Sequence, residues 1–149
     1  MKIAFFGSPG FALSTLALLH KQKDLQIVLV VTQPDRPGGR GLKLCPTAVK
    51  CKSLELGLPV IENMPTLAQL KNLQVEKIVV VAYGKFIPPE IVHGWDCINL
   101  HPSLLPKYRG PSPLEAALLN EDKKTGITTM LISDGMDDGD ILLQRDIPI

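Results

Sequence analysis

Gln26-Ile27-Val28-Leu29-Val30-Val31-Thr32 is a near-continuous apolar run early in the chain. An unbroken run, in contrast to an alternating one, is typical of a parallel β-strand that is covered on both faces. Residues 77–82 form an even more apolar run, in which three valines follow one another. The two runs together favour a parallel sheet buried between layers of helices.

Further strands and helices alternate around these two runs. The additional strands are predicted at residues 2–6, 58–61, 97–100, 127–132 and 141–145. Helices are predicted at residues 11–21, 46–56, 67–73, 88–93 and 113–120. This alternation predicts an α/β fold with a doubly wound, mostly parallel sheet. The sequence contains neither repeats nor an internal linker, so residues 1–149 are interpreted as one domain.

The composition is that of a soluble globular protein. The 149 residues are 45% hydrophobic and 21% charged, and a net charge of +1 gives no overall attraction to nucleic acid or membrane. No apolar run reaches the ~18 residues that span a bilayer, and the N-terminal residues do not resemble a signal peptide. Cys45, Cys51 and Cys97 lack a metal-binding spacing, so we interpret them as reduced, packing cysteines of a cytoplasmic protein.

Asn99 and His101 are the first candidates for chemistry. Side-chain alternation along the predicted strand places both on the same side of its carboxyl end, where open α/β sheets bind ligands. An amide and an imidazole together suit polar acyl chemistry, and such a site requires a carboxylate to orient the imidazole. The alternative, with equal weight from this pair alone, is a hydrogen-bonded core histidine beside a turn-forming asparagine.

The acidic segment Asp134–Asp140 has three interpretations. It does not fit an EF-hand calcium loop, because Gly135 comes too early and no glutamate stands at the last position. It is then either a solvated acidic turn or the source of an aspartate that fixes the tautomer of His101. The spacing does not choose among Asp134, Asp137 and Asp138 for that contact.

Two further segments also have alternative interpretations. The turn 7–10 occupies the position of a dinucleotide-binding glycine loop, but Pro9 replaces the second glycine, so we expect no NAD. The loop 33–44 is either a plain surface loop or a phosphate-binding loop, whose cations would be Arg36, Arg40 and Lys43. Tyr83 and Phe86 either cover the core or wall a pocket for a flat ring.

Together these motifs resemble the N-terminal catalytic domain of the methionyl-tRNA formyltransferases over residues 1–149. The run Asn99–Pro106 is similar to the signature of folate-dependent formyltransferases in general, and the loop 33–41 is similar to that of the tRNA enzymes. The turn 6–12, the strand end 80–84 and the acidic run 135–140 also resemble the family. The resemblance implies a Rossmann-like formyltransferase fold, in a chain that lacks the family's C-terminal β-barrel domain.

The resemblance implies a role for each motif. Its catalytic trio comprises Asn99, His101 and Asp137. The formyl donor, 10-formyltetrahydrofolate, is expected to contact Ser103, Leu104, Leu105, Pro106, Tyr83, Gly84, Phe86 and Ile87. Initiator methionyl-tRNA is expected to contact Arg36, Arg40 and Lys43. No metal is expected, and Asp138, where the family has threonine, is expected to add negative charge beside the trio.

The predicted reaction is formyl transfer to the amine of methionyl-tRNA in translation initiation. Asn99 and His101 would donate to the negative charge that develops on the formyl oxygen, and Asp137 would favour the cationic imidazole and help to move the proton of the amine. One alternative is a formyltransferase that acts on a small amine, either an amino sugar or glycinamide ribonucleotide. Another is a folate- or tRNA-binding module without catalysis.

Overall fold

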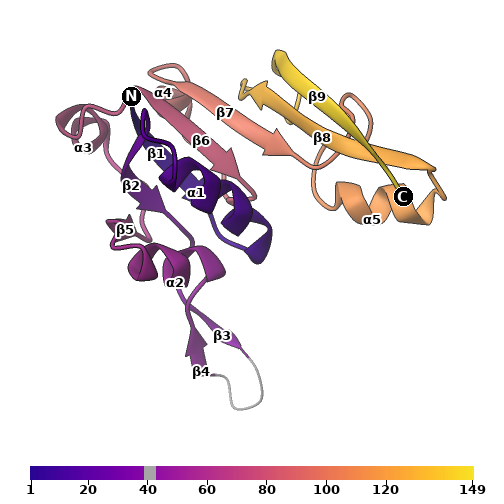
Figure 1. The fold of residues 1–149 in the computed structure, drawn as a ribbon. Coiled ribbons are helices and arrows are strands. Elements are labelled where there is room, and N and C mark those ends of the chain that lie inside the picture. The colour runs from indigo at the N-terminus through magenta and orange to yellow at the C-terminus, as the bar shows by residue number, and fades with distance from the viewer. Residues whose placement is uncertain (39–42) are drawn as a thin grey trace.

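A seven-stranded sheet forms the centre of the molecule in a computed structural model that describes residues 1–38 and 43–149 (Figure 1). The strands of this sheet lie in the order β5-β2-β1-β6-β7-β8-β9. Their bounds are β1 Lys2–Gly7, β2 Gln26–Val31, β5 Val60–Ile61, β6 Lys77–Val81, β7 Asp96–His101, β8 Lys124–Leu131 and β9 Ile141–Pro148. The helices are α1 Leu13–His20, α2 Ala48–Glu55, α3 Leu67–Asn72, α4 Pro89–Val92 and α5 Pro113–Leu119.

The first five strands of the sheet in spatial order, from β5 to β7, are parallel, and β8 and β9 pair antiparallel at one side. The prediction of a mostly parallel sheet is therefore confirmed. The last two strands extend beyond the ranges predicted for them, because Lys124 pairs in register with Pro148 at the far end of the ladder. A lysine–aspartate ion pair, Lys124 Nζ to Asp146 Oδ2 at 3.0 Å, lies on this extension.

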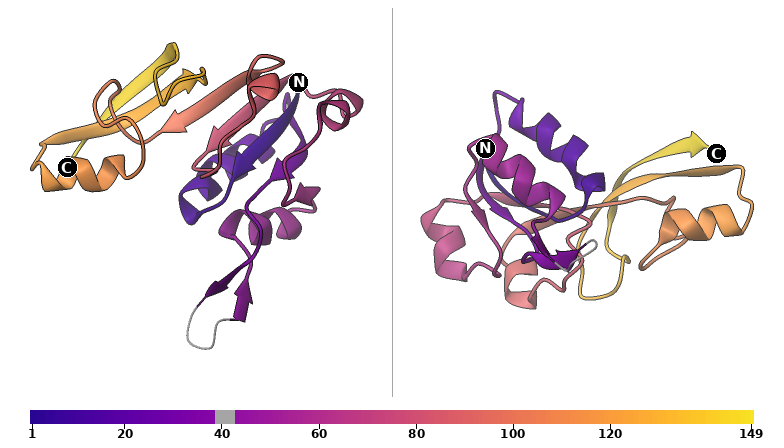
Figure 2. Two further views of the ribbon diagram at one scale, coloured as in Figure 1. Left: turned by 180° about the vertical axis from the view of Figure 1, so that it is seen from behind. Right: turned by 90° about the horizontal axis from the view of Figure 1, so that it is seen from below.

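Helices cover both faces of the parallel part, as Figure 2 shows, which confirms the doubly wound arrangement. On one face Leu16 of α1 and Val49 of α2 are fully buried in a cluster with β1 and β2 side chains. On the other face Leu70 of α3 and Ile91 of α4 pack against a second buried cluster. The candidate site also lies on this second face, because Val80 of β6, which lines the cavity of that site, belongs to the same cluster.

Side-chain caps start two of the helices. The hydroxyl of Thr47 accepts from the backbone of Lys50 at the start of α2, and Thr66 forms a capping box with Gln69 at the start of α3. The helix predicted from residue 11 differs in its first turn, which is a 3-10 turn at Gly10–Ala12 before α1 begins.

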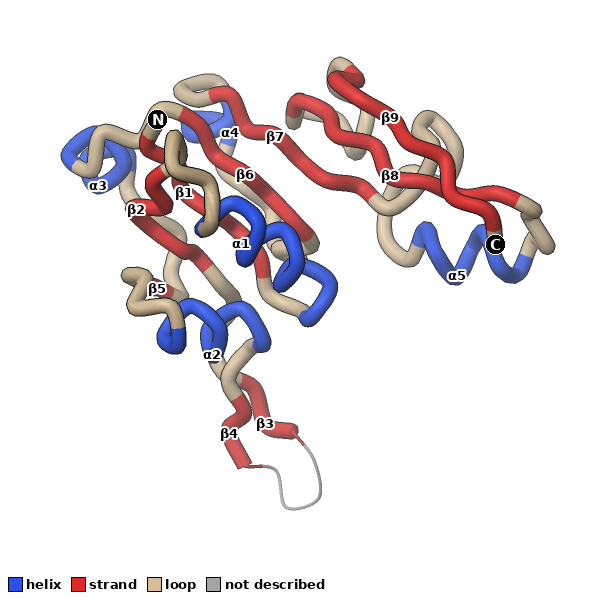
Figure 3. The backbone as a smooth tube through the Cα atoms, viewed as in Figure 1, coloured by secondary structure: helices blue, strands red, loops and turns tan. Residues whose placement is uncertain are grey.

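The prediction of a loop over residues 33–44 was wrong in part. Two short strands, β3 Arg36–Gly38 and β4 Lys43–Cys45, pair antiparallel and form an arm that projects from the body (Figure 3). An isolated two-stranded hairpin can include Pro37, because an edge strand leaves room for a residue that lacks the amide hydrogen. Arg40 lies outside the described residues.

The cysteine prediction holds for one residue only. Cys45 and Cys51 are exposed and Cys97 is buried, so two of the three do not pack in the core. All three are free thiols. Burial raises the pKa of the Cys97 thiol to about 12, since an apolar environment disfavours the thiolate. No helix in the described part of the chain has the length and apolar character that a membrane crossing requires.

Candidate active site

The candidate site lies where β7 ends and the loop between β8 and β9 folds back over it. Within the sheet Asn99 pairs with Met130 and His101 pairs with Thr128 of the antiparallel neighbour β8. Asn99 and His101 are two residues apart on one strand, so their side chains lie on the same face. Cys97, two residues before Asn99 on the same strand, has its side chain on this face as well. Because Cys97 belongs to the core cluster that includes Ile91 of α4, the face is the one that α4 covers.

Asn99, His101 and Asp137 come together in the structure. The Asn99 amide Nδ2 donates to Asp137 Oδ1 over 3.4 Å, and Nδ1 of His101 lies 3.5 Å from Asp137 Oδ2. The His101 side chain is only 6% exposed and that of Asp137 is 18% exposed. Asp137 adopts a positive φ of 49°. The histidine is thus the buried member of the group.

The three aspartates that sequence spacing leaves equivalent have different partners. Asp137 approaches His101, while Asp134 Oδ1 lies 2.9 Å from Nε2 of the exposed His93. Asp138 accepts a hydrogen bond from the hydroxyl of Ser133 within its own loop. The effect of the extra charge at Asp138 on the neighbouring trio stays a prediction.

The backbone of residues 108–110 contacts both His101 and Asp137. The Tyr108 carbonyl accepts from His101 Nε2 over 2.8 Å, and the Gly110 amide donates to Asp137 Oδ2, also over 2.8 Å. A carbonyl oxygen can only accept, so this contact requires a proton on Nε2 of the imidazole. Nδ1 is then the nitrogen that faces Asp137.

A second network holds the segment after His101. The fully buried Thr128 donates through Oγ1 to the Ser103 carbonyl over 2.7 Å and accepts from the Leu105 amide over 3.2 Å. Gln144 on β9 donates to both the Leu105 carbonyl and the Thr128 hydroxyl, over 2.8 and 2.9 Å. Ser103 is itself buried and donates to the Lys107 carbonyl over 2.6 Å.

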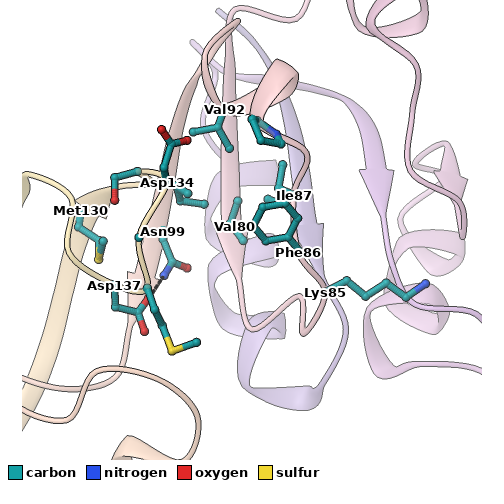
Figure 4. Close-up of a pocket in the computed structure, with 14 residues that line it drawn as sticks. Val80, Lys85, Phe86, Ile87, Val92, Asn99, Met130, Asp134 and Asp137 are labelled. Carbon is teal, nitrogen blue, oxygen red and sulfur yellow. Dashed lines mark hydrogen bonds between the residues drawn. The ribbon is translucent and has the colours of Figure 1, made fainter.

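A cavity of about 350 Å³ opens beside the trio (Figure 4). Asn99 and Asp137 face each other at one end of it, as the close-up shows, and the side chain of Lys85 extends away from them. Its walls are mostly apolar and include Val80, Phe86, Ile87, Val92, Met130 and Ile132. An apolar hollow with a few convergent polar groups is typical of a small-molecule site. His101 is not part of the wall.

Only some of the residues predicted to contact folate line the cavity. Phe86 and Ile87 line the cavity, whereas Ser103, Leu104, Leu105 and Pro106 do not. Tyr83 is 2% exposed and packs edge-on against Phe6 in the core, with ring centroids 5.4 Å apart. Gly84 is exposed in the adjoining loop. Their role toward a ligand stays a prediction.

Sequence reasoning missed most of the cavity wall. Val80 and Met130 lie on strands whose apolar runs fit a packed core equally well, so no sequence signal distinguishes them as cavity residues. The acidic loop is different, because Gly135 and Met136 line the cavity beside Asp137 and a glycine-rich acidic loop indicates a site. Tyr108 and Gly110 make their contacts through the backbone, which any residue type could do. Only the glycine at position 110 is a sequence signal for this part of the site.

The arm is connected to the same edge of the sheet. Arg36 and Lys43 are exposed on its two strands, and neither lines the cavity. Gln33, just before the arm, donates to the Tyr83 carbonyl over 2.8 Å. Lys50 of α2 pairs with Asp35, over 2.7 Å, and with Glu62. Both carboxylates raise the pKa of Lys50, so it remains charged at the base of the arm.

The described residues contain no cluster of side chains that could bind a metal ion. Over residues 1–38 and 43–149, no group of three or more histidine, cysteine, aspartate or glutamate side chains is arranged to hold an ion. The chemistry that the site offers is that of an amide donor and a carboxylate, which face one cavity with an imidazole behind them.

The sequence matches known proteins along its whole length. A sequence profile described as formyl transferase matches residues 1–149. A methionyl-tRNA formyltransferase of Synechocystis sp. is 47% identical over 157 residues and covers 100% of the chain, and one of Thermodesulfovibrio yellowstonii is 49% identical over 156 residues and covers 99% of it. The chain spans 48% and 50% of these two proteins, about half the length of the curated relatives it matches.

Solved structures share the fold. Phosphoribosylglycinamide formyltransferase from Bacillus halodurans superposes with a TM-score of 0.78 at 25% identity, covering 100% of this chain and 80% of that one. Methionyl-tRNA formyltransferase from Clostridium thermocellum superposes with a TM-score of 0.67 at 22% identity, covering 99% of this chain and 53% of that one. The second likeness, at its low identity, extends to the fold alone.

Proposed function

The chain belongs to the formyl transferase family, and on that premise we propose that it transfers a formyl group from 10-formyltetrahydrofolate to the amine of methionyl-tRNA. The observation that carries the proposal is the pair Asn99 and Asp137, which face one apolar cavity with His101 directly behind the carboxylate. The identity of 47% and 49% to methionyl-tRNA formyltransferases favours the tRNA amine over the small amines.

The size and the chemistry of the cavity support the proposal that it holds the flat ring of a folate. Its volume of about 350 Å³ lies within the range of small-molecule pockets, and Phe86 and Ile87 supply apolar contact at one side. The polar end formed by Asn99 and Asp137 supports a pose in which the formyl group points toward these two residues. Folate supplies the formyl carbon, and the other chemical roles fall to protein side chains.

Transfer forms a C–N bond to the amine as the C–N bond to the folate N10 breaks, and the proton of the amine is finally carried to N10. Asn99 donates from Nδ2 to the formyl oxygen, where negative charge develops, and one such donor contributes on the order of 3 kcal/mol. Asp137 accepts the proton that the amine loses. His101 lies behind Asp137, and in its cationic form Nδ1–H stabilises and orients the carboxylate while Nε2–H donates to the Tyr108 carbonyl.

The same site would serve any formyl-transfer acceptor, so the acceptor must be identified by experiment. The purified protein is incubated with 10-formyltetrahydrofolate and either methionyl-tRNA or glycinamide ribonucleotide, and formylated product is quantified for each. We expect formyl-methionyl-tRNA as the main product. Formylation of glycinamide ribonucleotide alone would replace the proposed acceptor, and folate binding without either product would indicate a binding module.

Two variants and one matched control test the site itself. Asp137→Asn and His101→Ala are expected to lower kcat/KM more than about tenfold, a loss above ~1.4 kcal/mol in transition-state stabilisation. His93→Ala is the control, because His93 also pairs with an aspartate of the same loop but lies outside the trio. Equal losses in all three variants, or none in the first two, would contradict the assignment.

A further inference from the structure

Asp122 lies outside the trio but is connected to it through Tyr108. It stands in the turn between α5 and β8, and its backbone amide donates to the Ala117 carbonyl over 3.1 Å, which fixes it on the end of the helix. Its Oδ2 accepts a 2.8 Å hydrogen bond from the Tyr108 hydroxyl. The carbonyl of the same tyrosine holds Nε2 of His101.

Lys107 completes this anchor. Its Nζ donates to both carboxylate oxygens of Asp122, over 2.8 and 2.7 Å, and lies 5.0 Å from the centre of the Tyr108 ring. The hydrogen bonds from Lys107 and then Tyr108 hold the pKa of Asp122 below its usual range, so the carboxylate stays charged as an acceptor. Three side chains thus hold one another outside the cavity.

The anchored tyrosine has an unusual backbone. Tyr108 adopts a φ of +59°, in the left-handed region that is costly for a residue with a side chain. This conformation needs support from the surrounding contacts. The Tyr108–Asp122 hydrogen bond is such a support, because it ties the ring to an element that is separate in sequence.

We propose that Asp122 is a positioning residue, which acts through Tyr108 to hold the carbonyl that receives Nε2–H of His101 and so directs Nδ1 to Asp137. The inference rests on the proposed function for its catalytic consequence. The tautomer itself follows from the hydrogen bond, since a carbonyl accepts only from a protonated nitrogen. Loss of the anchor frees the carbonyl, and both tautomers then become accessible to the ring.

The variants are Asp122→Ala and Tyr108→Phe, and the second removes only the hydroxyl. Asp146→Asn is the matched control, because Asp146 also pairs with a surface lysine, Lys124, and has its pKa lowered by that lysine, and its side-chain hydrogen bond and ion pair are with Lys124 on β8. The first readout is the long-range ¹H–¹⁵N spectrum of the imidazole rings at alkaline pH. The chain has three histidines, so His101 is assigned by one substitution.

We expect the Nε2–H tautomer of His101 in the wild-type protein and the control, and a mixture of tautomers in the two variants. The second readout is formyl transfer, for which we expect kcat to fall about tenfold or more with KM for the folate within about twofold. A double variant should lose no more than Asp122→Ala alone, because the Tyr108–Asp122 hydrogen bond is already absent from that single variant.

The two readouts separate the two claims. An unchanged His101 spectrum in both variants overturns the positioning role, whatever the activity. A wild-type protein that shows the Nε2–H tautomer but transfers no formyl group overturns the proposed function and leaves the positioning of the ring established. A loss of kcat equal to that of the Asp146→Asn control overturns the catalytic consequence.

Discussion

The backbone amide of Gly110 donates to Oδ2 of Asp137 over 2.8 Å, across 27 residues of sequence. The same oxygen faces Nδ1 of His101 at 3.5 Å. A loop that follows β7 therefore holds a carboxylate that belongs to the loop between β8 and β9. The geometry of the proposed catalytic trio therefore depends on how these two loops meet.

Replacement of Gly110 by alanine is expected to disturb this meeting point. Gly110 has a φ of +86°, and an added Cβ would lie 3.2 Å from Sδ of Met136. The left-handed conformation alone costs about 1–2 kcal/mol for alanine. We expect a lower midpoint of urea unfolding together with a loss of formyl transfer.

Gly57→Ala is the control for the strain. Gly57 has a similar φ of +68° at the end of α2, but nothing lies within 4 Å of the added Cβ. It should lose comparable stability and keep its activity. Equal activity of the two variants would show that Gly110 has no specific role at the site.

Thr128→Val is expected to release the segment that follows His101. Valine keeps the shape of threonine but removes the hydroxyl that holds the Ser103 carbonyl and the Leu105 amide. Buried groups left without partners cost about 1–3 kcal/mol, which urea unfolding measures. Thr129→Val is the control, because Thr129 makes one long contact of 3.5 Å to Leu143. A similar loss in both variants would contradict the network.

The three thiols are expected to react unequally with Ellman's reagent. Cys45 and Cys51 are exposed, whereas Cys97 is buried and its pKa is raised to about 12. The thiolate is the reactive form, so the native protein should release two equivalents quickly and the third only after denaturation. Three fast equivalents would show that β7 opens readily.

The contribution of Asp122 to stability is expected to depend on pH. The pKa of its carboxyl is below the usual 3.8 because Lys107 and Tyr108 donate to it. The contribution is therefore present above that usual value and is lost as the pH falls through the lowered pKa of the folded state. Urea midpoints of wild type and Asp122→Ala should differ near neutral pH and converge in acid. A constant difference across the range would exclude the ion pair as the cause.

The arm is expected to bind the phosphates of methionyl-tRNA through Arg36 and Lys43. Each phosphate contact that is removed should lower the slope of log affinity against log salt by about one. Filter binding of Arg36→Ala and Lys43→Ala at several salt concentrations measures this slope. Lys21→Ala, an exposed lysine at the end of α1, is the control. If the salt slopes of Arg36→Ala and Lys43→Ala equal that of Lys21→Ala, the arm does not contact the tRNA phosphates.

The sequence alone indicated the sheet and its helices because these depend on local patterns. The near-continuous apolar run at residues 26–32 is typical of a strand buried on both faces, and β2 lies inside the sheet between β5 and β1. Asn99 and His101 share a face because side chains alternate along any strand. The arm was not predicted as a hairpin, since its pairing of Arg36 with Cys45 has no alternating apolar pattern.

Tertiary structure decided everything that depends on contacts between distant segments. Asp134, Asp137 and Asp138 are equivalent in spacing, and only the fold brings Asp137 to Asn99, 38 residues away. The fold also placed His101 behind the carboxylate and selected Nε2 as its protonated nitrogen through the Tyr108 carbonyl. Residue types determine which hydrogen bonds are possible, but the direction in which each donor points is fixed only when the chain is packed.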